Sequence, residues 1–200
     1  MKKILQISNV LFATMLLLSS CDTTPIARPM GHMRIGLPNA EAYVLTPSPM
    51  GCPISFERNE QSKINLKDSS NCWIDVYFPT LRSTVQLTYK PVGEDFEAMV
   101  RDAQKLAYKH TIKASGMREQ FFAYPEKKMY GMYYEMSGAS AATTQFYATD
   151  STHHFLRGVL YHYSVPNPDS LQPVTDFMRS EILHLIETLE WTNTPEDELP

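Results

Sequence analysis

The chain has 200 residues, 43% of them hydrophobic and 20% charged, and its 18 basic and 22 acidic side chains give a formal net charge of −4. This composition fits one globular domain with a sizeable core, and it excludes coiled coils, collagen-like chains and disordered tails. Nucleic-acid binders usually need a basic excess to neutralise phosphates, so we expect no nucleic acid as a partner.

Residues 1–20 have the order of an export signal, with Lys2 and Lys3 followed by an apolar stretch that is too short for a stable membrane span. The residues Leu18-Ser19-Ser20-Cys21 resemble the bacterial lipobox. The resemblance implies that Cys21 becomes the first residue of the mature chain and carries a diacylglycerol and an acylated amine. Two or three acyl chains, at about 0.8 kcal/mol per buried methylene, give stable anchoring. The alternative is an ordinary signal peptide with an accidental cysteine.

Three further segments follow from composition. Residues 21–31 are rich in Pro and Thr and are expected to form an extended tether. Residues 32–191 form a single folded domain without internal repeats, and residues 192–200 form a flexible acidic tail.

Cys52 and Cys72 remain once Cys21 is lipidated. In an exported protein a disulfide between them is the default expectation. It would close a loop of about 20 residues, worth roughly 3 kcal/mol, around a polar segment at 58–71 that would otherwise be floppy. Two buried free thiols are one alternative. A metal site is another, although the two cysteines lack partners at ligand spacing.

The middle of the chain predicts two strands and then a helix. Residues 72–78 and 84–90 are rich in β-formers, and apolar and polar residues alternate in the second run. From Asp95 the spacing changes to three and four residues, which predicts a helix that ends near Gly116 in a left-handed stop. Its expected apolar stripe is Phe96, Met99, Ala103, Leu106 and His110.

Four more strands are predicted at 117–124, 129–136, 143–150 and 153–163, joined by short turns that favour antiparallel pairing. A last helix is expected to begin at a cap on Asp169 or Ser170, with Pro173 in its first turn, and to end in Glu190-Trp191. The predicted class is therefore α+β, an antiparallel β-sheet with two main helices packed on it. This element order is similar to the PsbP and Mog1 sandwich.

Asp150-Ser151-Thr152-His153-His154 is the main candidate for metal or acid–base chemistry, because a carboxylate and two imidazoles occur within five residues. Geometry weakens this idea, since successive strand residues point to opposite faces, and His154 and His162 would stand about 26 Å apart. The alternative is that Asp150 and Ser151 cap a turn and the histidines are partly exposed. We expect no metal and no cofactor.

Arg101, Lys105, Lys109 and Lys113 recur every fourth residue and form a basic ribbon. The ribbon could bind an acidic partner or lipid headgroups. Equally, basic residues near the end of a helix that opens with acidic ones simply complement the helix dipole. His110 and His184 are expected to be core histidines that share a ring proton with a carbonyl.

Six tyrosines concentrate in the predicted hairpins, which suggests either an aromatic contact surface or core packing with hydroxyls at the rim. They are Tyr130, Tyr133, Tyr134, Tyr147, Tyr161 and Tyr163. The sequence lacks the nucleophile-elbow, Walker A, zinc-protease and dinucleotide motifs, so the commonest classes of hydrolase, NTPase and zinc protease are unlikely.

Longer fragments resemble the GldD gliding-motility lipoproteins of the Bacteroidetes over nearly the whole mature domain. The fragments are RP at 28–29, RIGLP at 34–38, CPISF at 52–56, WIDVYFP at 73–79, LTYKP at 87–91, LAYKHT at 106–111, YG at 130–131, DSTHHFLRG at 150–158 and ETLEW at 187–191.

The resemblance implies a cell-envelope lipoprotein needed for gliding and linked to the type IX secretion machinery, with other gliding or secretion lipoproteins as partners. The only functional position it transfers is the lipid-bearing Cys21. We therefore expect a non-catalytic assembly or stabilising factor, or one used for secretion alone. Its place is the periplasmic side of the outer membrane, or the inner membrane if Asp22 acts as a retention signal. The rival hypothesis is an envelope enzyme or small-ligand binder that uses the turn from Asp150 to His154.

Overall fold

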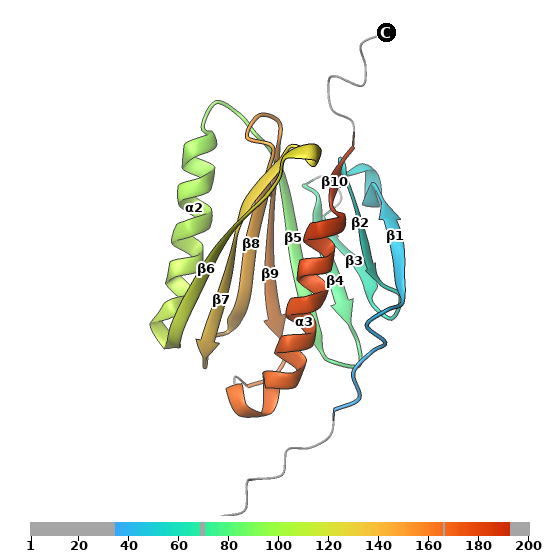
Figure 1. The fold of residues 1–200 in the computed structure, drawn as a ribbon, viewed down its shortest axis with the longest axis vertical. Helices are drawn as coiled ribbons and strands as arrows, with labels where there is room; N and C mark the ends of the chain where they lie inside the picture. The colour runs from blue at the N-terminus through green and yellow to red at the C-terminus, as the bar shows by residue number, and fades with distance from the viewer. Residues whose placement is uncertain (1–34, 69–70, 166, 193–200) are drawn as a thin grey trace, which may run out of the picture. The chain divides into compact units, whose positions relative to one another are not determined.

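The computed structural model describes residues 35–68, 71–165 and 167–192, so the expectations for the signal, the tether, Cys21 and most of the tail lie outside the described residues. Two helices, α2 and α3, accompany two antiparallel sheets (Figure 1). The small sheet has the order β1-β2-β10, and the large sheet has the order β3-β4-β5-β9-β8-β7-β6. The α+β class with two main helices is therefore confirmed.

The bounds of the elements are as follows. The strands are β1 Tyr43–Pro47, β2 Ile54–Asn59, β3 Lys63–Asp68, β4 Trp73–Phe78, β5 Ser83–Pro91, β6 Ala114–Tyr124, β7 Met129–Gly138, β8 Ala142–Thr149, β9 His154–His162 and β10 Glu190–Trp191. The helices are α2 Phe96–Lys109 and α3 Pro168–Thr188, and short 3-10 turns form η1 Pro49–Gly51, η2 His110–Lys113 and η3 Pro125–Lys127.

The two faces of the large sheet bury different helices. Side chains alternate along β9, so Leu156 joins the core that contains α3, whereas Phe155 joins a second core that contains α2. The small sheet belongs to the α3 side, where Ile54 and Phe56 of β2 are fully buried. Figure 1 shows α3 alongside β2 and β10, and α2 at the β6 end of the large sheet.

The small sheet contradicts one sequence expectation. Glu190 and Trp191 do not end the last helix, because they pair with Ser55 and Ile54 as strand β10. The polar segment at 58–71, which was expected to be held by a disulfide between Cys52 and Cys72, contains the end of β2 and all of β3, a strand of the large sheet. The hydrogen-bonded register of β3 against β4 orders this polar stretch.

Both helices also differ from prediction at one end. Helix α2 stops at Lys109, and Gly116 lies in β6 opposite Ser137 with no left-handed conformation. From Ala114 onward the backbone pairs with β7 as a strand, so the helix does not extend to Gly116. Helix α3 begins earlier than predicted: Asn167 is its cap and accepts a hydrogen bond from the Ser170 N–H at 3.3 Å. Pro173 therefore lies inside the helix rather than in its first turn.

Gly158 shows how tightly the large sheet is packed. It pairs with Phe146 on β8, and a Cβ added at this glycine would lie 2.1 Å from Phe146 Cε1. Phe146 is 1% exposed, so its ring has no free space to move into. We expect Gly158→Ala to lower the free energy of unfolding by about 2 kcal/mol, because overpacking a dense core forces strain.

Urea denaturation measures this loss, and Gly93→Ala is the matched control because nothing lies within 4 Å of a Cβ added there. The control is expected to stay within about 0.5 kcal/mol of the unchanged chain. Equal stability of the two variants would contradict this description of the β8–β9 packing.

Candidate functional site

The Asp150 carboxylate organises the turn between β8 and β9. Its Oδ1 accepts hydrogen bonds from the N–H groups of Thr152, His153 and His154 at 3.0, 2.8 and 2.7 Å, and its Oδ2 accepts one from the Thr152 hydroxyl at 3.0 Å. Burial raises the pKa of Asp150, but these donors outweigh it and hold the pKa below its ordinary value. The carboxylate is thus fully engaged in shaping the turn.

His154 is buried, not partly exposed as predicted, with 3% of its surface accessible. Its Nδ1 lies 2.8 Å from the Tyr89 hydroxyl, and its ring stacks on Trp191 at a centroid distance of 5.0 Å. The Nε2 atom has no hydrogen-bond partner among the described residues. The sequence could place His154 on a face of β9 but could not show that β10, far along the chain, covers it.

The other histidines do not converge on His154. His153 is exposed, and its Nδ1 lies 3.6 Å from Asp150 Oδ2. His162 bonds the Ser83 hydroxyl at 2.7 Å and the Thr175 hydroxyl at 3.1 Å. Within the described part of the chain, no group of three His, Cys, Asp or Glu side chains is placed to hold a metal ion.

The pKa of His154 is lowered, first by burial and then by His153, against an opposing effect of Asp150. The unfolded chain therefore takes up a proton on this ring at a higher pH than the folded chain does. The stabilising contribution is complete above the unfolded value of about 6.5 and is lost as the pH falls through it towards the folded pKa. We expect the urea midpoint to drop between pH 7.5 and pH 5.5.

Two histidine variants test whether His154 causes this pH dependence of stability. His154→Phe, which cannot titrate, is expected to show a smaller drop than the unchanged chain, whereas His153→Gln at the exposed neighbour is expected to keep most of the drop, because burial is the larger cause of the lowered pKa of His154. Since the pKa of His162 is also lowered by burial, part of the dependence remains in both variants. An unchanged drop in His154→Phe would show that this ring does not resist protonation in the folded state.

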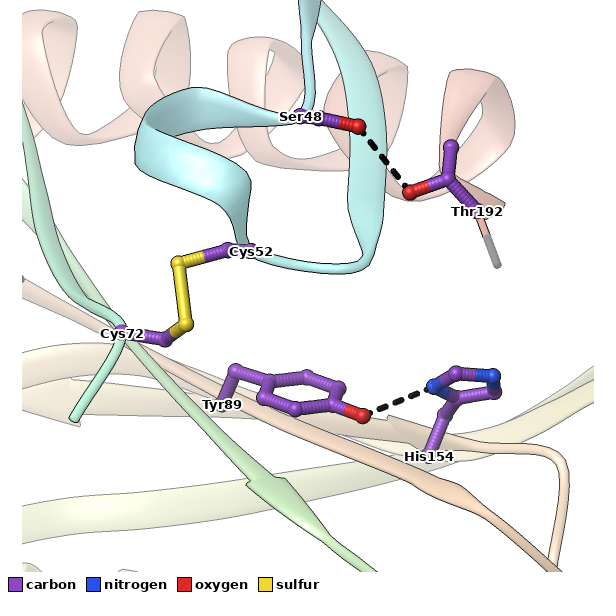
Figure 2. The surroundings of a disulfide bond; sticks show 6 residues. All are labelled: Ser48, Cys52, Cys72, Tyr89, His154 and Thr192. Carbon is purple, nitrogen blue, oxygen red and sulfur yellow. Dashed lines mark hydrogen bonds between the residues drawn. A yellow bond between two sulfur atoms is a disulfide. The ribbon is translucent and has the colours of Figure 1, made fainter. Parts of the chain in front are cut away.

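A disulfide joins Cys52 and Cys72 beside this buried pair (Figure 2). The Cα atoms are 5.7 Å apart; Cys52 precedes β2 of the small sheet and Cys72 precedes β4 of the large sheet. Nearby, Ser48 Oγ lies 3.1 Å from Thr192 Oγ1, and the Thr192 N–H donates to Pro53 O at 3.1 Å. The disulfide links the small sheet to the large sheet, and the contacts of Thr192 hold the end of the folded chain against the segments on either side of η1.

His184 lies in a polar cluster between α3 and the β1–β2 hairpin, and not against a carbonyl as predicted. Its Nε2 is 2.9 Å from Glu57 Oε2, and its ring stacks on Tyr43 at 3.6 Å. Glu181 accepts hydrogen bonds from the Tyr43 hydroxyl at 3.3 Å and from Asn59 Nδ2 at 3.5 Å. Burial raises the pKa of Glu181, and it also raises the pKa of Tyr43 to about 12.

His110 lies half-buried at the first residue of η2 and has no ring hydrogen bond among the described residues. The predicted carbonyl partner is therefore missing from this part of the chain. Its pKa is lowered by burial and then by the nearby Arg157.

The basic ribbon is exposed along its whole length, with Lys113 on η2 beyond the end of α2. Arg101 Nη1 pairs with Glu97 Oε2 at 3.2 Å, whereas no ion pair of Lys105, Lys109 or Lys113 occurs within the described chain. The Tyr108 hydroxyl donates to Glu119 and so ties α2 to β6.

Large apolar side chains are exposed beside the ribbon. Ile112 is 86% exposed, and Phe121 of β6 is 63% exposed. We call this combined surface the α2–β6 corner, and it consists of Lys105, Tyr108, Lys109, Ile112, Lys113 and Phe121.

The tyrosines divide between the two possibilities that the sequence left open. Tyr133, Tyr134 and Tyr147 are buried in the cores, as the packing alternative expects, but the hydroxyls of Tyr133 and Tyr134 are buried too and do not lie at the rim. Tyr130 and Tyr163 are exposed, and Tyr161 is half-buried. The six residues therefore do not form one aromatic contact surface.

The family model described as gliding motility lipoprotein GldD matches residues 22–191. No curated protein matches the chain. Across the described residues, no helix has the length and apolar character needed to cross a bilayer.

Proposed function

Because the chain belongs to the family of the gliding motility lipoprotein GldD, we propose that it is a non-catalytic assembly or stabilising factor of the cell envelope, linked to the type IX secretion machinery. The observation that carries this proposal is the extent of the family match, from the residue after Cys21 to the last folded strand. Membership implies a lipoprotein that is anchored to a membrane and serves gliding motility.

The proposed anchor is the lipid on Cys21, and the proposed location is the periplasmic side of the outer membrane, with the inner membrane as the alternative. Fractionation of the two membranes followed by immunodetection distinguishes these locations. Two or three acyl chains hold the domain at the bilayer and so confine it close to other envelope lipoproteins.

A non-catalytic role is supported by what the predicted reactive groups do. Asp150 accepts four hydrogen bonds within its own turn, and His154 is enclosed by Tyr89 and Trp191. Acid–base catalysis needs a titrating group that reaches a substrate proton. The rival enzyme or ligand-binding hypothesis would require this turn to open.

We place the docking surface at the α2–β6 corner. Its lysines stand free of ion pairs within the described chain, and exposed Ile112 and Phe121 add apolar contact area. Interfaces combine a desolvated apolar centre with a charged rim that steers the partner. The partner chemistry that fits is an acidic surface with an apolar centre on another envelope lipoprotein.

Charge reversal tests the docking surface. In Lys105→Glu/Lys109→Glu, we expect recovery of envelope partners after mild crosslinking and affinity purification to fall at least fivefold, because like charges now face the acidic partner. The control is Lys63→Glu/Arg82→Glu, which makes the same charge change at exposed positions elsewhere. Equal recovery from both variants, at matched protein levels, would exclude docking at this corner.

A further inference from the structure

The large sheet has one face that is only partly covered. Helix α2 packs on residues from β6 to β9, including Tyr134, Tyr147 and Phe155. On β4, Ile74 and Val76 point into the opposite core, so Trp73 and Asp75 lie on the α2 side of the sheet. In the described chain, the β3–β5 half of this face therefore has no helix over it.

Two cavities occupy this open half and adjoin at Thr88. One of about 390 Å³ is lined by Lys67, Trp73, Asp75, Gln86, Leu87 and Thr88. The other, of about 170 Å³, runs from Thr88 to the side of α2 and includes Lys90, Asp102, Leu106 and Arg157. We call this pair of cavities the sheet groove. The volume of the larger one falls in the range of small-molecule sites.

The sheet register arranges the polar groups of the groove in rows. Thr88 stands opposite Trp73 on one side and opposite Arg157 on the other. In the next row, Asp75 stands opposite Gln86. Directly paired side chains on one face of a sheet lie about 5 Å apart, so the rows present a closely spaced set of donors and acceptors beside the indole ring.

Two charged side chains of the groove, Asp75 and Arg157, have few ion-pair partners for groups with a purely structural role. Asp75 is 5% exposed, and its one ion-pair partner among the described residues is Lys67, at 3.6 Å, whose own side chain is 59% exposed. Arg157 donates to Gln145 Oε1 at 2.6 Å and has no carboxylate partner within the described residues. Trp73 is 48% exposed.

We propose that the sheet groove binds a neutral glycan, with the Trp73 ring stacked on the apolar face of one sugar and Asp75, Gln86, Thr88 and Arg157 hydrogen-bonded to its hydroxyls. A sugar ring offers both an apolar C–H face and an array of hydroxyls, which matches an exposed indole beside a carboxylate, an amide and a guanidinium. Both signs of charge line the groove, with the acidic Asp75 and Asp102 beside the basic Lys67, Lys90 and Arg157. This balance disfavours a strongly charged ligand.

Two other occupants fit less well. An extended peptide would bind by adding a strand at an edge, but β4 and β5, which carry Trp73, Asp75, Gln86 and Thr88, are paired on both sides, and the edge strand β3 contributes only Lys67 to the groove. An acyl chain would leave the carboxylate of Asp75 and the guanidinium of Arg157 desolvated without partners. The site is separate from the α2–β6 corner, so it does not depend on the docking proposal.

Calorimetric titration of the purified full-length lipoprotein tests the proposal, in a detergent without a sugar headgroup. The probes are the tetramers of N-acetylglucosamine, of β-1,4-linked glucose and of α-1,4-linked glucose. We expect saturable binding of at least one of them. Trp73→Ala and Asp75→Asn are expected to weaken it at least tenfold, whereas Trp73→Tyr keeps an aromatic platform and retains most of the affinity.

Phe121→Ala, which removes an exposed aromatic ring at the far edge of the sheet, is the matched control and is expected to bind normally. Near-ultraviolet circular dichroism verifies that Asp75→Asn is folded, and Trp73→Ala provides an independent variant at an exposed position. The proposal is overturned if none of the three glycans binds, if Trp73→Ala leaves binding unchanged, or if octanoate or an unrelated decapeptide occupies the groove in preference to all three.

Discussion

Cys21→Ser is expected to move the protein from the membrane fraction to the soluble periplasmic fraction and to abolish colony spreading. Serine cannot form the thioether to diacylglycerol, so the chain loses the acyl groups that hold it at the bilayer. Membrane fractionation with immunodetection measures the first effect, and spreading on agar measures the second.

Ser19→Ala is the matched control, because it keeps a small residue before the cysteine and is expected to leave both anchoring and spreading intact. A second control fuses the Cys21→Ser chain to an unrelated lipoprotein signal and tether, which is expected to restore spreading. If the Cys21→Ser protein stays in the membrane fraction and the cells spread normally, lipid anchoring at this residue is not the basis of function.

Removal of the disulfide has the second large effect. In Cys52→Ser/Cys72→Ser, we expect the free energy of unfolding to fall by roughly 3 kcal/mol, because a loop of about 20 residues is no longer closed in the unfolded chain. For a domain of this size the loss corresponds to a melting temperature lower by about 6–12 °C. Thermal denaturation followed by circular dichroism measures it.

Reduction is the matching control: the unchanged chain in dithiothreitol should have the same melting temperature as the double variant. The single variant Cys72→Ser should do the same. Identical melting of the oxidised chain and the double variant would mean that the bridge adds no stability. The disulfide links the small sheet to the large one, so its removal takes away a covalent connection between the two sheets.

Much of the fold was predictable, because it rests on local periodicity. The run at 84–90 shows two-residue alternation, the run at 72–78 is rich in β-formers, and the four later strands lie at hairpin distances between turn signals; the structure confirms all of them within a few residues. Helix α2 and helix α3 likewise follow from their apolar spacing. These patterns hold because one face of each of these elements packs towards a core, even where, as in α2, only Ala103 and Ala107 are fully buried.

The parts that were not predictable depend on contacts between distant segments. Strand β10 is two residues long and exists because it pairs with β2, far earlier in the chain. The burial of His154 depends on the same strand, since Trp191 covers its ring. The end of α2 depends on edge pairing between β6 and β7, which no local signal at Gly116 reveals.

The sheet groove was missed for a related reason. Apolar and polar residues alternate in the predicted strand at 84–90, but the sequence could not show that Trp73, Asp75 and Arg157 of two other strands lie on the same face as its polar residues. Only the register of β4 and β9 against β5 does so. The sequence signal that could have indicated the groove is Asp75, an aspartate between apolar neighbours in the strand from Trp73 to Phe78; the structure shows that it is buried.

The most direct test of the central claim, that this lipoprotein acts by docking another envelope component, is site-specific photocrosslinking in living cells. A photoreactive amino acid in place of Lys109, within the α2–β6 corner, is predicted to give one dominant crosslink to an envelope lipoprotein of the motility and secretion machinery. The same group in place of exposed Glu126 on η3 should give none. Equal crosslinking at the two positions, or none at Lys109 in cells that glide normally, would contradict the account.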